Sequence, residues 1–174
     1  MLRLGGFVLN IEKALTIDGF MMKSELEYIA HLAKQSMCIA EIGCFQGRSG
    51  RAWADNAAGI VVCVDFWRDG GETNFDANLA DVLGSKIFKV RMASQSAAKM
   101  FNYLGARFNA IFIDADHDYD NVKADILAWR PLLSEGGILA GHDYQPAFPG
   151  VIAAVKELIQ PFQVVGGSIW TTEI

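Results

Sequence analysis

Residues 37–50 read MCIAEIGCFQGRSG, an apolar run that leads into a turn with two glycines and then into a helical pattern. Gly43 and Gly47 permit a tight passage from strand to helix and let a ligand approach the backbone closely. The stretch lacks the G-x-G-x-x-G pattern and the lysine of a phosphate-binding P-loop. Glu41 would repel a pyrophosphate and suits an ammonium group instead. The passage therefore predicts a strand, turn and helix that hold a ligand with an ammonium group.

The rest of the chain alternates between short apolar runs and helical patterns. The runs predict strands at 37–42, 60–65, 86–90, 110–114 and 137–141. Strands that are apolar almost throughout, alternating with helices, predict an α/β fold whose mainly parallel sheet is covered on both faces.

The two ends of the chain differ from this core. Residues 22–34 form a helical pattern in which Ser24 and Glu27 have capping-box spacing. Two β-rich runs around Gly166 and Gly167 predict an antiparallel hairpin at the sheet edge, which gives seven strands. We expect one domain over 1–174, made of a helical segment (1–35), a βα core (36–160) and the hairpin (161–174).

Composition and charge narrow the classes of function. The 174 residues carry a net charge of −5 and are 52% hydrophobic and 20% charged, as expected of a globular domain. An acidic chain argues against nucleic acid or an anionic membrane as partner, and no apolar run approaches the ~20 residues that span a bilayer. Three cysteines without metal-binding spacing, and no signal-peptide pattern, predict a cytoplasmic protein with reduced thiols.

Polar residues end the predicted strands, at the edge of the sheet where α/β folds bind ligands. They are Glu41, Asp65, Asp114 with Asp116, and His142 with Asp143. Asp65 ends the second strand, the usual place for a carboxylate that binds ribose hydroxyls. An adenosine ligand with an amino-acid tail would satisfy Glu41 and Asp65 together.

At these motifs the sequence resembles the class I S-adenosylmethionine (SAM) dependent methyltransferases, over nearly the whole chain. EIGCFQGRS is similar to their first motif, VVCVDFW to the acidic end of their second strand, and LLSEGGILAG to the entry of their fifth strand. FIDADHDY with GGILAGHDY resembles more narrowly the cation-dependent O-methyltransferases, such as the caffeoyl-CoA, catechol and macrolide-sugar enzymes. The resemblance implies a Rossmann-like, doubly wound fold and methyl transfer from SAM to a hydroxyl of a small molecule.

The resemblance also assigns residues to SAM. Glu41 would hold its amino group, directly or through water, and Asp65 its ribose hydroxyls, with Phe66 and Trp67 beside the adenine. Trp67 can equally be a core residue, and Ser94 can equally cap a helix. The full set of expected cofactor residues is Glu41, Gly43, Cys44, Gly47, Ser49, Asp65, Phe66, Trp67, Ala93, Ser94 and Asp114.

The run IFIDADHDYD carries an aspartate at every second position, and three interpretations compete for it. Its spacing matches an EF-hand loop, but Tyr119 stands where that loop needs glycine, and a strand precedes it. Asp118 and Asp120 suit capping of the following helix, whereas Asp116 fits either a local or a functional role. Asp114, at the strand end, is expected to be functional.

A divalent cation is the third interpretation of this run. Asp114 would hold it with His142 and Asp143, because neighbouring strands lie about 5 Å apart. The enzymes that the sequence resembles place two oxygen ligands at the latter two positions, whereas His142 offers nitrogen. Magnesium prefers oxygen, and histidine suits manganese, iron or zinc better. Either the ion is not magnesium, with manganese as the alternative, or His142 only lines the site and water takes its place.

His117 lies three residues after Asp114, as in the macrolide-sugar enzymes, where the matching histidine is proposed as the base. Histidine exchanges protons readily near neutral pH, so His117 is predicted to take the proton of the acceptor hydroxyl, with Asp114 as the second catalytic residue. A loop histidine without a role is the alternative. We expect residues 20–22 and the loop 142–150 to face the acceptor, and an apolar N-terminal segment in so short a chain predicts a homodimer.

Two other classes of function remain open at this point. A nicotinamide-dependent oxidoreductase is compatible with Asp65, but Glu41 and the missing third glycine disfavour it. A non-catalytic SAM-binding or partner module is disfavoured by His117, His142 and Asp143 together, because a purely structural strand end does not need them.

Overall fold

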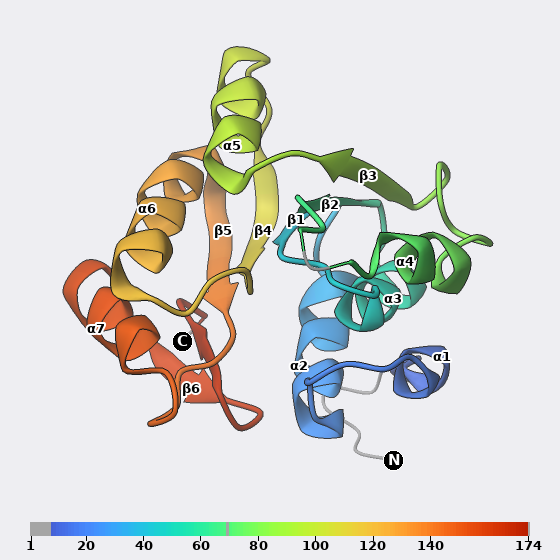
Figure 1. Ribbon diagram of the computed structural model, residues 1–174, viewed down its shortest axis with the longest axis horizontal. Coiled ribbons are helices and arrows are strands. Elements are labelled where there is room, and N and C mark those ends of the chain that lie inside the picture. Colours follow the sequence, from blue (N-terminus) through green and yellow to red (C-terminus); the bar gives the residue numbers. More distant parts are fainter. Residues whose placement is uncertain (1–7, 69, 174) are drawn as a thin grey trace.

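The computed structural model describes residues 8–68 and 70–173, which form one seven-stranded sheet with helices on both sides (Figure 1). The strands are β1 (Cys38–Ile42), β2 (Ile60–Asp65), β3 (Ile87–Arg91), β4 (Phe108–Ile113), β5 (Leu133–Gly141), β6 (Gln163–Val165) and β7 (Ile169–Thr171). Their order in the sheet is β3-β2-β1-β4-β5-β7-β6. Strands β1 to β5 run parallel, and β7 is antiparallel to both of its neighbours. The predicted sheet, with its C-terminal hairpin at one edge, is confirmed.

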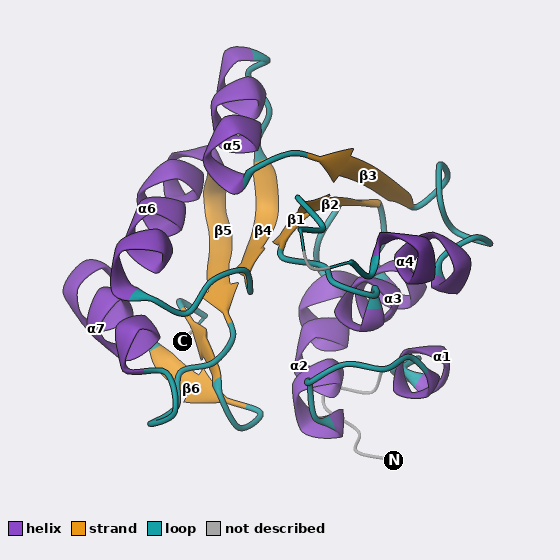
Figure 2. Ribbon diagram, in the orientation of Figure 1, coloured by secondary structure: helices purple, strands orange, loops and turns teal. Residues whose placement is uncertain are grey.

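Helices cover the sheet in two layers (Figure 2). They are α1 (Glu12–Thr16), α2 (Lys23–Lys34), α3 (Arg48–Asn56), α4 (Glu72–Asn78), α5 (Ser94–Tyr103), α6 (Tyr119–Trp129) and α7 (Pro149–Leu158), with a 3₁₀ turn η1 (Arg130–Leu132). One buried cluster joins α1 to α4 to the sheet, and a second joins α5 to α7 to the opposite face. None of the helices in the described residues is long and apolar enough to cross a membrane.

The apolar strands are explained by these two cores. Successive side chains of a strand point to opposite faces, so Ile39 packs in the cluster under α1 to α4 and Ala40 in the cluster under α5 to α7. Both are fully buried. A strand buried on both faces has no polar alternation, which is why β1 and β4 read as nearly continuous apolar runs, each interrupted by one polar residue.

The predicted boundaries differ most at β5. The sequence predicts a start at residue 137, but the strand begins at Leu133, which pairs with Phe108 of β4. The register then shifts, so that Ala110 pairs with Ile138. Because the pairing is interrupted at this irregularity, the first half of β5 does not show the regular pattern from which the strand was predicted.

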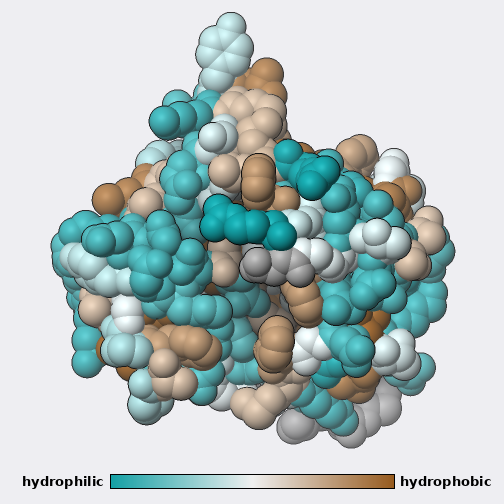
Figure 3. Space-filling model, viewed as in Figure 1, coloured by the Kyte–Doolittle hydropathy of each residue, from teal (hydrophilic) through white to brown (hydrophobic). Residues whose placement is uncertain are grey.

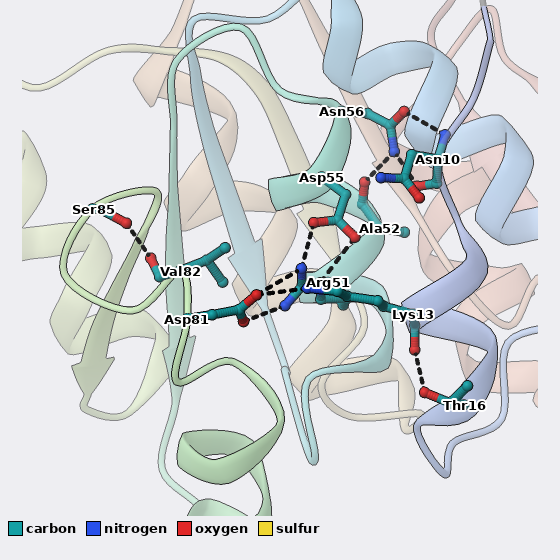
Figure 4. Close-up of polar contacts among 10 residues, drawn as sticks. All are labelled: Asn10, Lys13, Thr16, Arg51, Ala52, Asp55, Asn56, Asp81, Val82 and Ser85. Carbon is teal, nitrogen blue, oxygen red and sulfur yellow. Dashed lines mark hydrogen bonds and ion pairs between the residues drawn. The ribbon is translucent and has the colours of Figure 1, made fainter.

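A buried ion-pair network ties α3 to the segments around it (Figure 4). Arg51 is only 3% exposed and holds Asp55 of the same helix by two hydrogen bonds, of 2.7 and 2.9 Å. It also donates hydrogen bonds to Asp81. The Asp81 carboxylate in turn forms an ion pair with Lys13 Nζ of α1 at 2.7 Å. The network fixes α1 and the loop before β3 against α3.

The start of α2 differs from the predicted capping box of Ser24 and Glu27. The N-cap is Met22, whose backbone N–H donates to Glu25 at 2.8 Å. Ser24 instead donates to the Gly166 carbonyl. The predicted capping box of Ser24 and Glu27 is therefore wrong, and the capping interaction is between Met22 and Glu25. Glu25 lies beside the C-terminal hairpin.

Candidate functional site

Two adjoining cavities open at the carboxyl ends of the parallel strands. The first, of about 440 Å³, lies over the ends of β1, β2 and β4 and the start of α5. The second, of about 700 Å³, lies between residues 18–22, the turn after β1 and the loops after β4 and β5. The wall they share consists of Gly43, Phe45, Asp114 and Ala115. Ligands in the two cavities would therefore meet at the ends of β1 and β4.

Asp65 organises the turns that frame the first cavity. Its Oδ2 accepts from the backbone N–H groups of Cys44 at 2.8 Å and Phe45 at 2.9 Å. Its Oδ1 accepts from the N–H of Trp67 at 2.6 Å. A carboxylate has about four acceptor positions, so about one remains for a ribose hydroxyl. Asp65 thus shapes the cavity as well as lining it.

The other residues predicted around the adenine lie together in the wall of one cavity. Phe66, Trp67, Ala93 and Ser94 all line the first cavity. The core interpretation of Trp67 is confirmed, because it is 5% exposed and packs edge-on against Phe75. It also forms part of the cavity wall, and its contact with adenine stays a prediction. Its indole N–H donates to a carbonyl of the turn after β1.

The helix-cap interpretation of Ser94 is wrong. Ala93 is the N-cap of α5, and no side chain caps this helix. The Ser94 hydroxyl donates to Asp125 at 2.5 Å and accepts from the Trp129 indole at 2.9 Å. Burial raises the pKa of Asp125 to about 6, with Ser94 and Gln95 opposing the rise. Asp125 and Gln95 also line the first cavity, and neither was predicted in this role, because both belong to helices and not to strand ends.

The two glycines after β1 have different roles. Gly43 lines both cavities, and a Cβ there would lie 2.0 Å from the carbonyl oxygen of Asp114. Gly47 is not among the described residues that line either cavity. A Cβ on it would lie 2.8 Å from Leu79, so it serves close packing at the start of α3. The turn therefore needs Gly43 for the site and Gly47 for the fold. Cys44 and Ser49 line the second cavity and not the first.

Glu41 is fully buried and is not among the described residues that line either cavity, so of its two predicted contacts with the SAM amino group the one through water stays the prediction. Its side chain is fully buried, with Oε2 3.5 Å from the Cys63 thiol, while Oε1 has no hydrogen-bond partner among the described residues. Burial raises the pKa of Glu41 to about 7, Asp114 adds to the rise, and Ser49 and Cys63 oppose it. Ser49 and Cys44, which interact with Glu41, both line the second cavity, where a ligand can reach them.

A buried charge cluster closes the floor of the second cavity. The Nδ1 atom of His142 lies 3.4 Å from Asp143 and 3.5 Å from Asp114, and its Nε2 lies 3.1 Å from Glu25. Burial lowers the pKa of His142, but Asp114, Asp143 and Glu25 outweigh this and raise it to about 12. The three carboxylates therefore favour the imidazolium form of His142. The sequence missed Glu25, because a residue of α2 is far along the chain from the strand ends.

The carboxylates respond to this cation in different ways. Burial would raise the pKa of Glu25, but His142, the Met22 amide and Ser168 lower it. Burial also opposes the net lowering of the pKa of Asp143, for which His142 is the main cause. The pKa of Asp114 is raised, because its burial outweighs the contribution of His142.

His117 contacts Asp143 in the wall of the second cavity. Its Nε2 lies 2.8 Å from Asp143 Oδ2, and its ring stacks on Phe148 with centroids 4.2 Å apart. The side chain is 45% exposed and lines the second cavity. A histidine that is held by a carboxylate and open to a cavity has the arrangement of a general base.

The remaining aspartates have local roles. Asp118 is the N-cap of α6 and accepts from the Asn121 N–H at 3.1 Å, as predicted. Asp120 lies in the first turn of that helix. Asp116 accepts from the backbone of His117 and Asp118, which confirms its local role. It also lines the first cavity, and a functional role there stays a prediction.

The predicted metal ligands come together, but their geometry does not fit a divalent ion. Both nitrogens of His142 face carboxylates, so the ring has no free lone pair for a metal. Asp114, His117 and Asp143 do place one ligand atom each within 4.8 Å of one another. However, Asp143 Oδ2 already accepts from His117, and its Oδ1 accepts from Gln145 at 2.9 Å and faces the His142 cation.

The comparisons with known proteins agree with this architecture. A family model described as a methyltransferase domain matches residues 40–144. No curated protein matches the sequence. An O-methyltransferase from Bacillus cereus, solved in complex with SAH (S-adenosylhomocysteine, the demethylated form of SAM), has a TM-score of 0.72 and 17% identity, over 92% of this chain and 89% of that one.

Two further solved structures have the same fold. CalS11, a TDP-rhamnose 3'-O-methyltransferase of calicheamicin biosynthesis, gives a TM-score of 0.64 at 18% identity, over 84% of this chain and 75% of that one. The SAH-bound methyltransferase PaMTH1 of Podospora anserina gives 0.66 at 17%, over 86% and 78%.

The fold and the cavities thus define a class I SAM-dependent methyltransferase with a Rossmann-like sheet. The chain belongs to the methyltransferase-domain family whose model matches more than half of its length. Membership of this family excludes the nicotinamide-dependent oxidoreductase.

Proposed function

We propose that this methyltransferase transfers the methyl group of SAM to a hydroxyl of a small molecule held in the second cavity. The observation that carries the proposal is the wall shared by the two cavities, at Gly43 and Asp114, with His117 lining the second. SAM, bound in the first cavity, supplies a methyl group on a sulfonium, which needs an aligned nucleophile more than it needs further activation.

His117 is the group placed to take the proton of the acceptor. The Nε2 atom lies 2.8 Å from Asp143 Oδ2, and a carboxylate there favours the tautomer with the hydrogen on Nε2, which leaves Nδ1 as the acceptor nitrogen. Asp143 fixes this tautomer and stabilises the imidazolium that forms, as an orienting carboxylate does in other histidine-based sites. Stacking on Phe148 holds the plane of the ring.

The second cavity suits a compact acceptor with one apolar face. Its walls include Phe20, Met21 and Phe45, with Phe148 beside His117. The Arg48 guanidinium fixes the N-terminal wall, because it donates to the carbonyls of Ile17 and Met21. An aromatic or otherwise apolar skeleton that carries a hydroxyl would match this lining.

The proposal does not include a divalent cation, since the predicted ligands Asp114, His142 and Asp143 are engaged with one another and with neighbouring protein groups. The cytoplasmic location, the homodimer, and the absence of nucleic-acid and membrane partners stay predictions of the sequence.

The test has two stages. Titration calorimetry with SAH should show binding to the wild-type chain. Radiolabelled SAM is then incubated with a panel of hydroxylated acceptors, including phenols and sugar nucleotides. For an acceptor that is methylated, His117→Ala should lower kcat by about 10²–10⁴-fold, the usual contribution of a general base. His31→Ala, on the outer surface of α2, is the matched control. Methylation of amines but not of hydroxyls, or full activity of His117→Ala, would contradict the proposal.

A further inference from the structure

We propose that His142 is a built-in cation that fills the place of a divalent metal in this site, so that the chain neither binds nor needs one. The side chain is 5% exposed and lies among three carboxylates that come from different parts of the fold. Glu25 belongs to α2, Asp114 follows β4, and Asp143 follows β5. One protonated ring thus joins the N-terminal segment to two neighbouring strand ends.

The arrangement of the ring supports a permanent charge. A neutral imidazole offers one N–H and one lone pair, so one of its nitrogens should face a donor or a metal. In His142 each nitrogen faces carboxylate oxygens, at 3.1 Å for Nε2 and at 3.4 and 3.5 Å for Nδ1. The Nε2 atom makes no hydrogen bond among the described residues, so its contact with Glu25 is electrostatic. Three carboxylates around one buried ring favour its doubly protonated form.

The neighbours of His142 are also fixed by bonds of their own. Glu25 Oε1 accepts from the N–H and the hydroxyl of Ser168, at 3.0 and 2.8 Å. Its Oε2 accepts from the Met22 N–H at 2.8 Å. Glu25 is therefore held in place beside His142 and has little freedom to move toward an ion.

A divalent ion would meet two obstacles here. An ion held by Asp114 and Asp143 would lie next to the imidazolium, and two buried positive charges repel strongly. Magnesium or manganese would also need several oxygen ligands, whereas about three of the four acceptor positions of Asp143 already face His117, Gln145 and His142. Both obstacles apply equally to the set of Asp114, His117 and Asp143.

The consequence for the reaction rests on the proposed function. His142 is then a positioning residue, which holds Asp143 in the orientation that fixes His117. It supplies positive charge near the acceptor without an exchangeable ion, so methyl transfer should persist in the presence of a chelator.

The first experiment uses the wild-type chain and needs no acceptor. Thermal unfolding is recorded with EDTA and with saturating magnesium, manganese or calcium, and ¹⁵N spectra of the histidine rings are recorded at pH 8. We expect the same Tm in all four conditions, and a His142 ring with both nitrogens protonated. A metal-induced rise in Tm of the apo chain, or a neutral His142 ring, would overturn the proposal.

The second experiment removes the cation. His142→Asp leaves four carboxylates without a cation, so we expect a lower Tm in EDTA and a new response to manganese or calcium. A bound ligand at about 100 times its dissociation constant should raise Tm by roughly 5–10 °C in a chain of this size. His142→Gln, which has no charge, should be destabilised and should not respond to metal. His31→Asp on the surface of α2 controls for the added carboxylate.

The outcomes separate this inference from the proposed function. A wild-type chain without metal response but with no methyl transfer to any hydroxyl would contradict only the proposed function. A wild-type chain that methylates a hydroxyl and stops in EDTA would contradict only this inference. If His142→Asp fails to fold even with metal, the wild-type Tm series and the ring spectra still decide.

Discussion

Three residues other than glycine adopt positive φ angles in the described part of the chain, and all three line the cavities. They are Phe45 at +43°, Trp67 at +49° and Asp143 at +61°. Such residues cost of order 1–3 kcal/mol each and persist only when their surroundings hold them. Asp65 holds the first two through their N–H groups, and His142 and Gln145 hold the third. Backbone strain is thus concentrated at the site and held there by polar contacts.

Gly43→Ala tests how tightly the shared wall is built. Its φ is +87°, and the added Cβ would lie 2.0 Å from the Asp114 carbonyl oxygen, so β1 and β4 would have to separate. Gly84→Ala is the matched control, since Gly84 has φ +78° but open space around its Cβ. Conformation alone should cost the control about 1–2 kcal/mol of unfolding free energy.

We expect Gly43→Ala to lower the unfolding free energy clearly more than Gly84→Ala does. It should also abolish SAH binding, whereas Gly84→Ala should bind SAH normally. Urea unfolding and calorimetry measure the two effects. Equal losses in both variants would mean that the close approach at Gly43 does not matter.

Glu41→Gln tests the pH dependence that a buried carboxyl predicts. Burial raises the pKa of Glu41 from 4.5 to about 7. The folded state therefore holds the proton more tightly than the unfolded state, so this contribution to stability is complete below about pH 4.5 and is lost as the pH rises through 7. The loss amounts to roughly 3 kcal/mol, and glutamine, which does not ionise, should not show it.

Urea unfolding at several pH values between 4.5 and 8 measures the difference between wild type and variant. Between pH 4.5 and pH 8 the unfolding free energy of the wild type should fall relative to that of the variant. Glu135→Gln, at an exposed position, is the control. Parallel curves for Glu41→Gln and wild type would show that Glu41 ionises normally.

At the scale of elements, α3 depends on the buried Arg51. Removing one partner of a buried ion pair leaves the other charge without compensation, which typically costs 3–5 kcal/mol. Asp55 has a side chain only 9% exposed, so Arg51→Leu should lower the unfolding free energy by roughly 3 kcal/mol. Lys13→Ala removes only an exposed contact to Asp81 and should change stability little. A chemical-denaturation curve for each variant decides, and similar effects of the two would show that burial is not the cause.

The elements were predictable because each depends on local pattern. Strands buried on both faces and helices with one apolar stripe are both visible in the sequence, and the glycines mark their ends. The start of α2 was not predictable in this way, because two residue pairs have the three-residue spacing of a capping box. The Ser24 hydroxyl donates to the Gly166 carbonyl instead of capping the helix. Asp114, His117, His142 and Asp143 were found as strand-end residues, but their partner Glu25 depends on how α2 docks on the sheet. Contacts between distant segments decide which of the polar residues act together, and a sequence pattern does not contain them.

At the scale of the whole molecule, the site lies on a face with an apolar middle. Figure 3 shows apolar side chains gathered between more hydrophilic flanks on this side of the molecule. Exposed aromatic residues that line the cavities include Phe20, Phe45 and Phe66. A face of this kind is a surface on which flat, partly apolar ligands bind.

Two cavities with a common wall predict that binding on one side can be weakened without the other. Phe66 lines only the first cavity, is 53% exposed and contributes little to the core, so Phe66→Ala should fold normally. Stacking of a base on an aromatic ring is worth about 1–3 kcal/mol, so SAH should bind roughly tenfold more weakly. Phe148→Leu changes only the second cavity and should leave the dissociation constant of SAH unchanged while raising the KM of the acceptor. Calorimetry and steady-state kinetics on both variants separate the two effects. If Phe148→Leu weakened SAH as much as Phe66→Ala does, the cavities would form one continuous ligand site, and the division into donor and acceptor sides would be wrong.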